Sequence, residues 1–170
     1  MNLNSLTKTQ HEFYTENGYL LLKQIFDVEE VRQQTREINR LMNEFGEIEK
    51  GWRGSWRRAY LDERENEISK IMILLNLHLY SSVYFRAVTH DKLVDAVFDL
   101  LDNGVELDHS VLHAKAPATG TPFPMHQDWP FYAHKDPYGF VDALLHIDNT
   151  DEANGRLKLL PGSHKLGPLQ

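Results

Sequence analysis

The segment His126-Gln127-Asp128 contains two residue types that commonly bind metals. Its histidine and its aspartate lie two positions apart. In an extended strand, side chains two positions apart point to the same face, so the imidazole and the carboxylate could bind one metal ion. They are two of the three ligands in the 2-His-1-carboxylate set of non-haem Fe(II) oxygenases. The pattern alone is weak evidence in a chain with nine histidines and 25 acidic residues, because a surface strand or turn could contain it.

The segment after this motif strengthens the metal hypothesis. It is rich in aromatic residues and could form the wall of an apolar pocket beside the metal. The candidate substrate-binding residues are Trp129, Phe131, Tyr132 and His134. The alternative is that half of them are ordinary core aromatics.

Four segments resemble, in the same order, the phytanoyl-CoA dioxygenase family of iron- and 2-oxoglutarate-dependent oxygenases. They are His126-Gln127-Asp128, Ala-Leu-Leu-His-Ile-Asp-Asn at 143–149, Asn-Gly at 154–155 and Pro-Gly-Ser-His-Lys at 161–165. The resemblance implies that His126 and Asp128 bind Fe(II), with 2-oxoglutarate as cosubstrate and O2 as oxidant. Hydroxylation of a small-molecule substrate would be the default reaction.

The resemblance also suggests a binding site for the cosubstrate. Lys70 and Gln127 are similar to residues that lie near 2-oxoglutarate in the family. Other interpretations exist for both, because a lysine beside an apolar stretch commonly extends its amine to solvent, and simple alternation points Gln127 to the opposite strand face.

The resemblance is incomplete at its downstream end. Family members have a second metal-binding histidine well after the Pro-Gly-Ser-His segment, and then a basic residue for 2-oxoglutarate, and neither lies within residues 1–170. We favour the hypothesis that the chain is an N-terminal portion of a longer oxygenase. The alternative is a naturally short member that cannot act alone, and His134, His146 and His164 remain candidates for the third ligand.

Composition bounds the remaining possibilities. With 170 residues, 41% of them hydrophobic, the chain can form one domain with a sizeable core. A net charge of −7 argues against nucleic-acid or anionic-membrane partners, which need a basic face. No apolar run approaches the about 18 residues that span a bilayer, and residues 1–8 lack a secretory pattern, so we expect a cytoplasmic protein. The absence of cysteine leaves nitrogen and oxygen ligands for any metal.

The N-terminal part is expected to be mostly helical. Thr7 and Gln10 have the spacing of a capping box and predict a helix to about Glu16, which Gly18 would end. A strand at 19–26 would follow. Apolar residues then recur every three or four positions and predict a helix over 28–45.

Two further stretches complete the N-terminal part. Residues 46–68 are interpreted as an irregular polar connection, with a basic and aromatic lid over an anionic substrate as the alternative. A helix is expected from Thr89 or Asp91 to about residue 102, and Gly104 would end it.

The C-terminal part is expected to be mainly β. Strands are predicted at 105–115, 139–146 and 156–160, separated by a loop at 116–122, a long turn at 148–155 and a tight turn at Pro161-Gly162. This pattern indicates an α+β or mainly β fold. The resemblance implies a double-stranded β-helix, which is a cupin-like jelly roll with the metal at one mouth, incomplete at its C-terminus. We expect one domain, with a helical part at 1–104 that includes a short strand, and the first part of the jelly-roll core at 105–170.

Two other functions remain open. A non-catalytic, cupin-like protein could bind a metal or small ligand without turning it over, and release of succinate coupled to a substrate would distinguish the two. A zinc hydrolase is more distant, because it needs a third protein ligand and a base that the sequence does not reveal.

Overall fold

The computed structural model describes residues 3–45, 47–49, 62–68, 71–101, 104–115, 125–128, 136 and 139–167. Several sequence-based expectations lie outside these ranges. They concern the loop at 116–122, Lys70, Trp129, Phe131, Tyr132 and His134.

Helix α1 (Lys8–Asn17) confirms the capping box and the stop signal. The backbone N–H of Gln10 donates to the Thr7 hydroxyl at 3.2 Å, and the Thr7 N–H donates to the Gln10 side chain at 2.8 Å. At the other end Gly18 adopts φ 79°, a left-handed conformation, and its N–H donates to the Tyr14 carbonyl.

Helix α2 (Val28–Phe45) has the predicted bounds. Asp27 accepts hydrogen bonds from the N–H groups of Glu29 and Glu30, and the Glu30 carboxylate accepts one from the Asp27 N–H, so the N-terminus is reciprocally capped. The predicted helix near residue 91 is α7 (Asp91–Leu101).

Two short helices, α5 (Leu77–Tyr80) and α6 (Ser82–Val88), come before α7. The stretch at 46–68 was wrongly interpreted as wholly irregular, because it contains strand β1 (Glu47–Glu49) and helix α4 (Glu63–Ile68). Among the described helices, none combines the length and apolar character needed to cross a bilayer.

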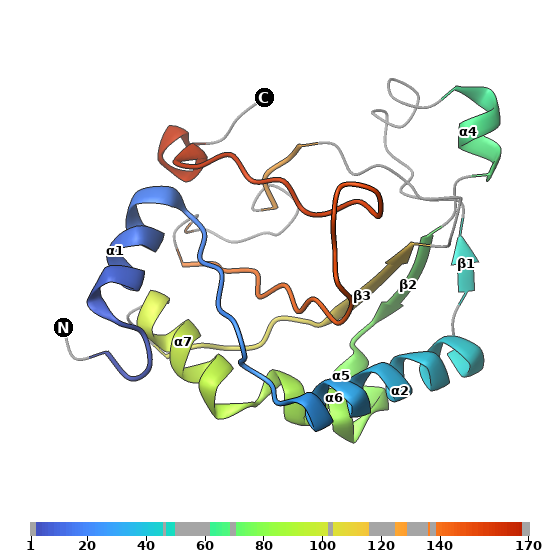
Figure 1. The fold of residues 1–170 in the computed structure, drawn as a ribbon, viewed down its shortest axis with the longest axis horizontal. Coiled ribbons are helices and arrows are strands. Elements are labelled where there is room, and N and C mark those ends of the chain that lie inside the picture. The colour runs from blue at the N-terminus through green and yellow to red at the C-terminus, as the bar shows by residue number, and fades with distance from the viewer. Residues whose placement is uncertain are drawn as a thin grey trace.

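The described strands form one antiparallel sheet in the order β1-β2-β3 (Figure 1), with β2 at Ile71–Leu75 and β3 at Val111–Lys115. Leu74 pairs with Leu112 in the β2–β3 ladder. Helix α2 contacts both β2 and α6. The sheet and these helices therefore enclose the core.

The centre of that core joins side chains that are distant in sequence. Leu41 from α2 is 1% exposed and packs with Leu74 of β2, Leu77 of α5, and Tyr84 and Ala87 of α6. The Tyr84 hydroxyl donates to the backbone carbonyl of Gln34 at 3.0 Å, and burial raises the pKa of Tyr84. The helices that precede and follow β2 are thus fixed to each other.

Three strand predictions were wrong. Residues 19–26, 139–146 and 156–160 have no strand, and the predicted strand at 105–115 begins only at Val111. A strand needs a neighbouring chain to complete its hydrogen-bond ladder, and the described residues offer none at these positions. The described residues therefore show an α+β arrangement, and the jelly roll stays a prediction.

The turns near the C-terminus were predicted correctly, and the last one contacts α1. Gly162 has φ 76°, and η2, a 3-10 helix at Ser163–Leu166, follows it. The Gly162 N–H donates to the Asn17 carbonyl at 2.9 Å, and His164 Nε2 donates to the Thr15 carbonyl at 3.0 Å. Figure 1 shows this red turn beside the blue α1 helix.

Candidate metal centre

His126 and Asp128 lie in residues 125–128, which the structure describes without regular secondary structure. The expected strand is absent here, yet the two side chains face each other. His126 Nε2 is 3.1 Å from Asp128 Oδ1, and the side chains remain 32% and 46% exposed. Both groups are therefore close together and accessible from solvent.

The separation of these two atoms fits two adjacent ligands of one octahedral ion. Donor atoms about 2.1 Å from a metal, at a right angle to each other, lie about 3.0 Å apart. The ring nitrogen and carboxylate oxygen also suit a borderline metal such as Fe(II) better than a soft one. A neutral imidazole and an ionised carboxylate are the forms that bind such an ion.

Gln127, between these two residues, points its amide toward the end of the described chain. Its Nε2 donates to the Gly167 carbonyl at 3.0 Å. This bond links the His126–Asp128 segment to the turn that contacts α1. The assignment of Gln127 to 2-oxoglutarate stays a prediction.

Two side chains that sequence reasoning missed interact with Asp128. Burial, a hydrogen bond to Asp128 and the negative charge of Asp128 raise the pKa of Asp142 to about 6, against an opposing effect of His109. Burial lowers the pKa of His113, a residue of β3, and the charge of Asp128 opposes that shift. Asp128 thus lies beside both β3 and the segment that contains Asp142.

The sequence contains a signal that could have identified Asp142 and His113. Asp142 interrupts the run Phe-Val-Asp-Ala-Leu at 140–144, and His113 interrupts Val-Leu-His-Ala at 111–114. A titratable residue within an apolar stretch often marks a functional site. The sequence pattern of both stretches predicts strands, and that prediction does not use their titratable residues.

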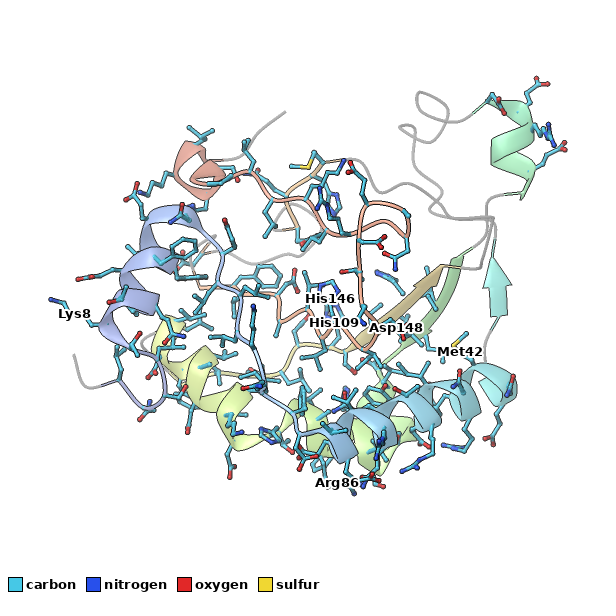
Figure 2. The ribbon with its side chains drawn as sticks, in the orientation of Figure 1. Lys8, Met42, Arg86, His109, His146 and Asp148 are labelled. Carbon is cyan, nitrogen blue, oxygen red and sulfur yellow. The ribbon has the colours of Figure 1, made fainter. Side chains whose placement is uncertain are left out.

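Two of the candidates for a third ligand, His146 and His164, lie within the described residues. His164 belongs to the turn on α1, where it bonds to Thr15. Figure 2 shows His146 in the central part of the view, where His109 also appears. Within the described ranges, no group of three or more histidine, aspartate or glutamate side chains has the geometry to hold a metal.

The sequence model of the family described as phytanoyl-CoA dioxygenase (PhyH) matches residues 14–170. This range includes His126, Asp128 and the turn at Pro161-Gly162. No solved structure matches the chain significantly.

Curated relatives give the same result. A probable alpha-ketoglutarate-dependent hypophosphite dioxygenase of Stutzerimonas stutzeri is 32% identical over 92% of this chain and 53% of its own length. An ectoine dioxygenase of Bordetella parapertussis is 26% identical over 95% and 51%. The peroxisomal phytanoyl-CoA dioxygenase of Bos taurus is 26% identical over 98% and 50%. The chain spans about half the length of these relatives.

Proposed function

Because the chain belongs to the phytanoyl-CoA dioxygenase family, we propose that it contributes to an Fe(II)- and 2-oxoglutarate-dependent oxygenase that hydroxylates a small molecule. The observation that supports this most directly is the 3.1 Å separation of His126 Nε2 and Asp128 Oδ1. Two ligand types of the facial set lie at the distance that adjacent coordination positions require.

In this proposal neutral His126 supplies Nε2 and ionised Asp128 supplies Oδ1 to the iron. Bound iron and 2-oxoglutarate would supply the oxidising power with O2. Asp142 shares a hydrogen bond with Asp128 and so restricts the orientation of that carboxylate. Gln127, bonded to Gly167, holds the backbone between the two ligands.

The remaining parts of the site would come from outside the described residues. We infer a third ligand and a basic residue for 2-oxoglutarate there, consistent with the chain being an N-terminal portion of the oxygenase. Lys70 remains the candidate cosubstrate contact, and the substrate pocket would be formed by Trp129, Phe131, Tyr132 and His134. The jelly-roll core would begin at residue 105, after the helical part at 1–104, within one domain.

The substrate is a small molecule in this proposal, and its class stays open. The names of the relatives include hypophosphite dioxygenase, ectoine dioxygenase and L-proline trans-4-hydroxylase. These names refer to chemically unlike substrates. All three names refer to oxidation, so we expect these relatives to differ in the residues that bind their substrates.

The second candidate is a cupin-like protein that binds a metal or small ligand without turnover. The His126–Asp128 pair by itself is compatible with such a site. A protein with two ligands would hold iron weakly and would not couple 2-oxoglutarate to oxidation.

Turnover separates the two candidates. The complete oxygenase that this proposal implies would be purified under nitrogen and loaded with Fe(II), and succinate would be measured with 2-oxoglutarate, O2 and a panel of small substrates. We expect succinate from the wild type and at least about a 100-fold loss in Asp128→Ala, because losing a ligand should cost more than losing a residue that supports one. Glu106→Ala is the matched control, since Glu106 is an exposed carboxylate. Iron binding without succinate would favour the binding protein.

A further inference from the structure

Asp142 lies beside the candidate metal centre, although it is not one of the ligands that the sequence predicts. Its carboxyl group shares a hydrogen bond with Asp128, and Asp128 Oδ1 is 3.1 Å from His126 Nε2. The ligand pair belongs to residues 125–128, whereas Asp142 belongs to the segment at 139–146. Asp142 therefore reaches the centre from a different part of the chain and leaves both candidate ligands able to bind an ion.

The Asp142 side chain is accessible to small molecules. Asp142 is an exposed residue, and the side chains of His126 and Asp128 are also open to solvent. The protein nevertheless shields part of the Asp142 carboxyl group, and this burial is the largest cause of its raised pKa. A partly shielded carboxylate attracts a charged ligand more strongly than one surrounded by water does, because the local dielectric constant is lower. A small molecule at the metal centre could thus form a strong ion pair with Asp142.

The charges around Asp142 are mainly negative. Within the described part of the chain, the charged groups that act on Asp142 are Asp128 and His109. Nδ1 of His109 donates to the Asp108 carboxylate at 2.6 Å, so this imidazole is shared between two carboxylates. A divalent ion bound to Asp128 would offset the charge of that carboxylate. The charge of Asp142 would remain, and a positively charged group on the substrate could balance it.

We propose that Asp142 selects for a substrate that carries an ammonium group. This inference rests on the proposed oxygenase function, because it concerns the same metal centre. The ionised Asp142 carboxylate has only acceptor atoms, and an ammonium group has only donors and a positive charge. Asp142 accepts a hydrogen bond from the ammonium group and so holds a neighbouring carbon atom beside the metal centre. The same carboxylate repels an anionic substrate, and this repulsion adds to the specificity.

The test uses the complete oxygenase under nitrogen, with Mn(II) in place of Fe(II) and with 2-oxoglutarate bound. Mn(II) is bound by the same nitrogen and oxygen ligands, and its paramagnetism broadens the NMR signals of molecules that bind near it. The bound 2-oxoglutarate prevents a carboxylate probe from occupying the position of the cosubstrate. A pH of 8, well above the pKa of about 6 of Asp142, keeps its carboxyl group ionised.

The probes are butylammonium, butanol and butyrate, which have four carbon atoms each and differ in charge. Each is titrated at constant ionic strength to about 50 mM, because ligands of this size bind in the millimolar range. We expect saturable broadening of the butylammonium signals, with a dissociation constant at least about tenfold below that of butanol. Butyrate should show no saturable broadening.

Variants then assign this preference to Asp142. Asp142→Asn removes the charge but keeps an amide N–H that can donate to Asp128, so it should weaken butylammonium binding at least about tenfold and leave butanol binding unchanged. Asp142→Lys should reverse the preference and allow butyrate to bind. Asp91→Asn, which alters an exposed aspartate of α7, is the matched control and should bind as the wild type does. All variants are compared at saturating Mn(II), so a change in metal affinity does not affect the comparison.

Two results would overturn the role of Asp142. One is butyrate or butanol binding at least as tightly as butylammonium to the wild type, or no saturable broadening of butylammonium, and neither outcome depends on the folding of a variant. The other is unaltered butylammonium binding in Asp142→Asn, which would mean that the ammonium group binds elsewhere.

Failure of the proposed oxygenase function gives a different result, which electron paramagnetic resonance of Mn(II) detects. Mn(II) that binds to the wild type and is lost in Asp128→Ala, without a preference for butylammonium, would remove only the role of Asp142. A wild type that leaves all Mn(II) free in solution would remove the metal centre itself, and the role of Asp142 with it.

Discussion

At the scale of single residues, Asp128 has neighbours on more than one side. His126 lies 3.1 Å away along the same segment, and Asp142 shares a hydrogen bond from a distant one. A carboxylate restrained in this way has less freedom to turn away from an ion. Its side chain therefore loses less conformational entropy when an ion binds. The two carboxylates repel unless a proton or a cation lies between them, and this repulsion favours a bound metal.

Asp99 in α7 is a second carboxylate with several direct partners, and its role is structural. It is 3% exposed and accepts hydrogen bonds from the backbone N–H groups of Asn4, Ser5 and Leu6 at 2.7 to 2.8 Å. Burial alone would raise the pKa of Asp99, but these hydrogen bonds outweigh it and the net pKa is lowered. This side chain fixes the N-terminal segment to α7.

We predict that Asp99→Ala lowers the free energy of unfolding by about 3 kcal/mol, because it leaves several donors without an acceptor. Denaturant unfolding followed by circular dichroism would measure the loss. Asp95→Ala, one turn earlier in α7, is the matched control and should change stability by less than about 1 kcal/mol. Equal effects of the two substitutions would contradict the role of Asp99.

At the scale of elements, Glu37 connects α2 to the start of α6. Hydrogen bonds from Arg40 and from Ser81, the residue that caps α6, lower the pKa of Glu37 from 4.5 to about 2. The Glu37 side chain is 16% exposed and that of Arg40 is 48% exposed, so solvent screens part of this interaction. A carboxylate with a depressed pKa stabilises the fold fully above its unfolded pKa, and the contribution is lost as the pH falls through the folded pKa.

We therefore predict that Glu37 contributes about 1 to 2 kcal/mol to stability above pH 4.5, and that this contribution disappears between pH 4.5 and about 2. Urea unfolding at several pH values would show a smaller decrease over that window in Glu37→Gln than in the wild type. Glu12→Gln, in an exposed pair with Lys8, is the control. Identical pH profiles for the wild type and Glu37→Gln would refute the link.

The end of α1 and the turn at 161–166 form a second connection between elements. A Cβ added at Gly18 would lie 2.3 Å from His164 Nδ1, and the φ of 79° already disfavours any side chain. Lys165 Nζ pairs with Glu16 Oε2 at 2.6 Å on the same side. The turn and the helix end therefore fit only when residue 18 has no side chain.

We predict that Gly18→Ala lowers the free energy of unfolding by more than about 1 kcal/mol, through backbone strain and displacement of His164. Gly104→Ala is the matched control, because a Cβ there meets nothing within 4 Å and the φ is not in the left-handed region. Adding His164→Ala to Gly18→Ala should restore part of the loss by removing the contact. A double variant no more stable than Gly18→Ala would assign the whole loss to the backbone.

The elements that sequence predicted well are those whose signals are local. The Thr7 cap, the Gly18 stop and the spacing of α2 each depend on residues within a few positions, and the structure confirms them. The strands at 139–146 and 156–160 were wrong because a strand depends on a partner that local sequence does not specify. The spacing of His126 and Asp128 predicted that the two side chains lie close together, as they do, but by way of a strand that residues 125–128 do not form. The approach of Asp142 and His113 depends on tertiary folding.

At the scale of the whole molecule, the described surface is uneven in its apolar content. Leucines of the two segments without strand pairing are about half exposed or more: Leu144 at 62%, Leu157 at 49%, Leu159 at 50% and Leu160 at 55%. Figure 1 shows the segment at 156–160 in the upper part of the view, away from α2, and the segment at 139–146 in the centre. Additional strands of the proposed jelly roll would cover such side chains.

The final prediction is that the 170-residue chain binds a fluorescent apolar dye and associates as its concentration rises, because exposed apolar side chains favour contact with each other. Leu157 and Leu159 are two positions apart, so in an extended segment they share a face. Changing both to lysine should reduce dye fluorescence by roughly half and shift sedimentation toward the monomer. Leu21→Lys is the control, because Leu21 is 71% exposed but lies in a different segment. If Leu21→Lys reduced association as much as the double variant does, the change in net charge would explain the effect. The segments at 139–146 and 156–160 would then not be the surface through which the chains associate.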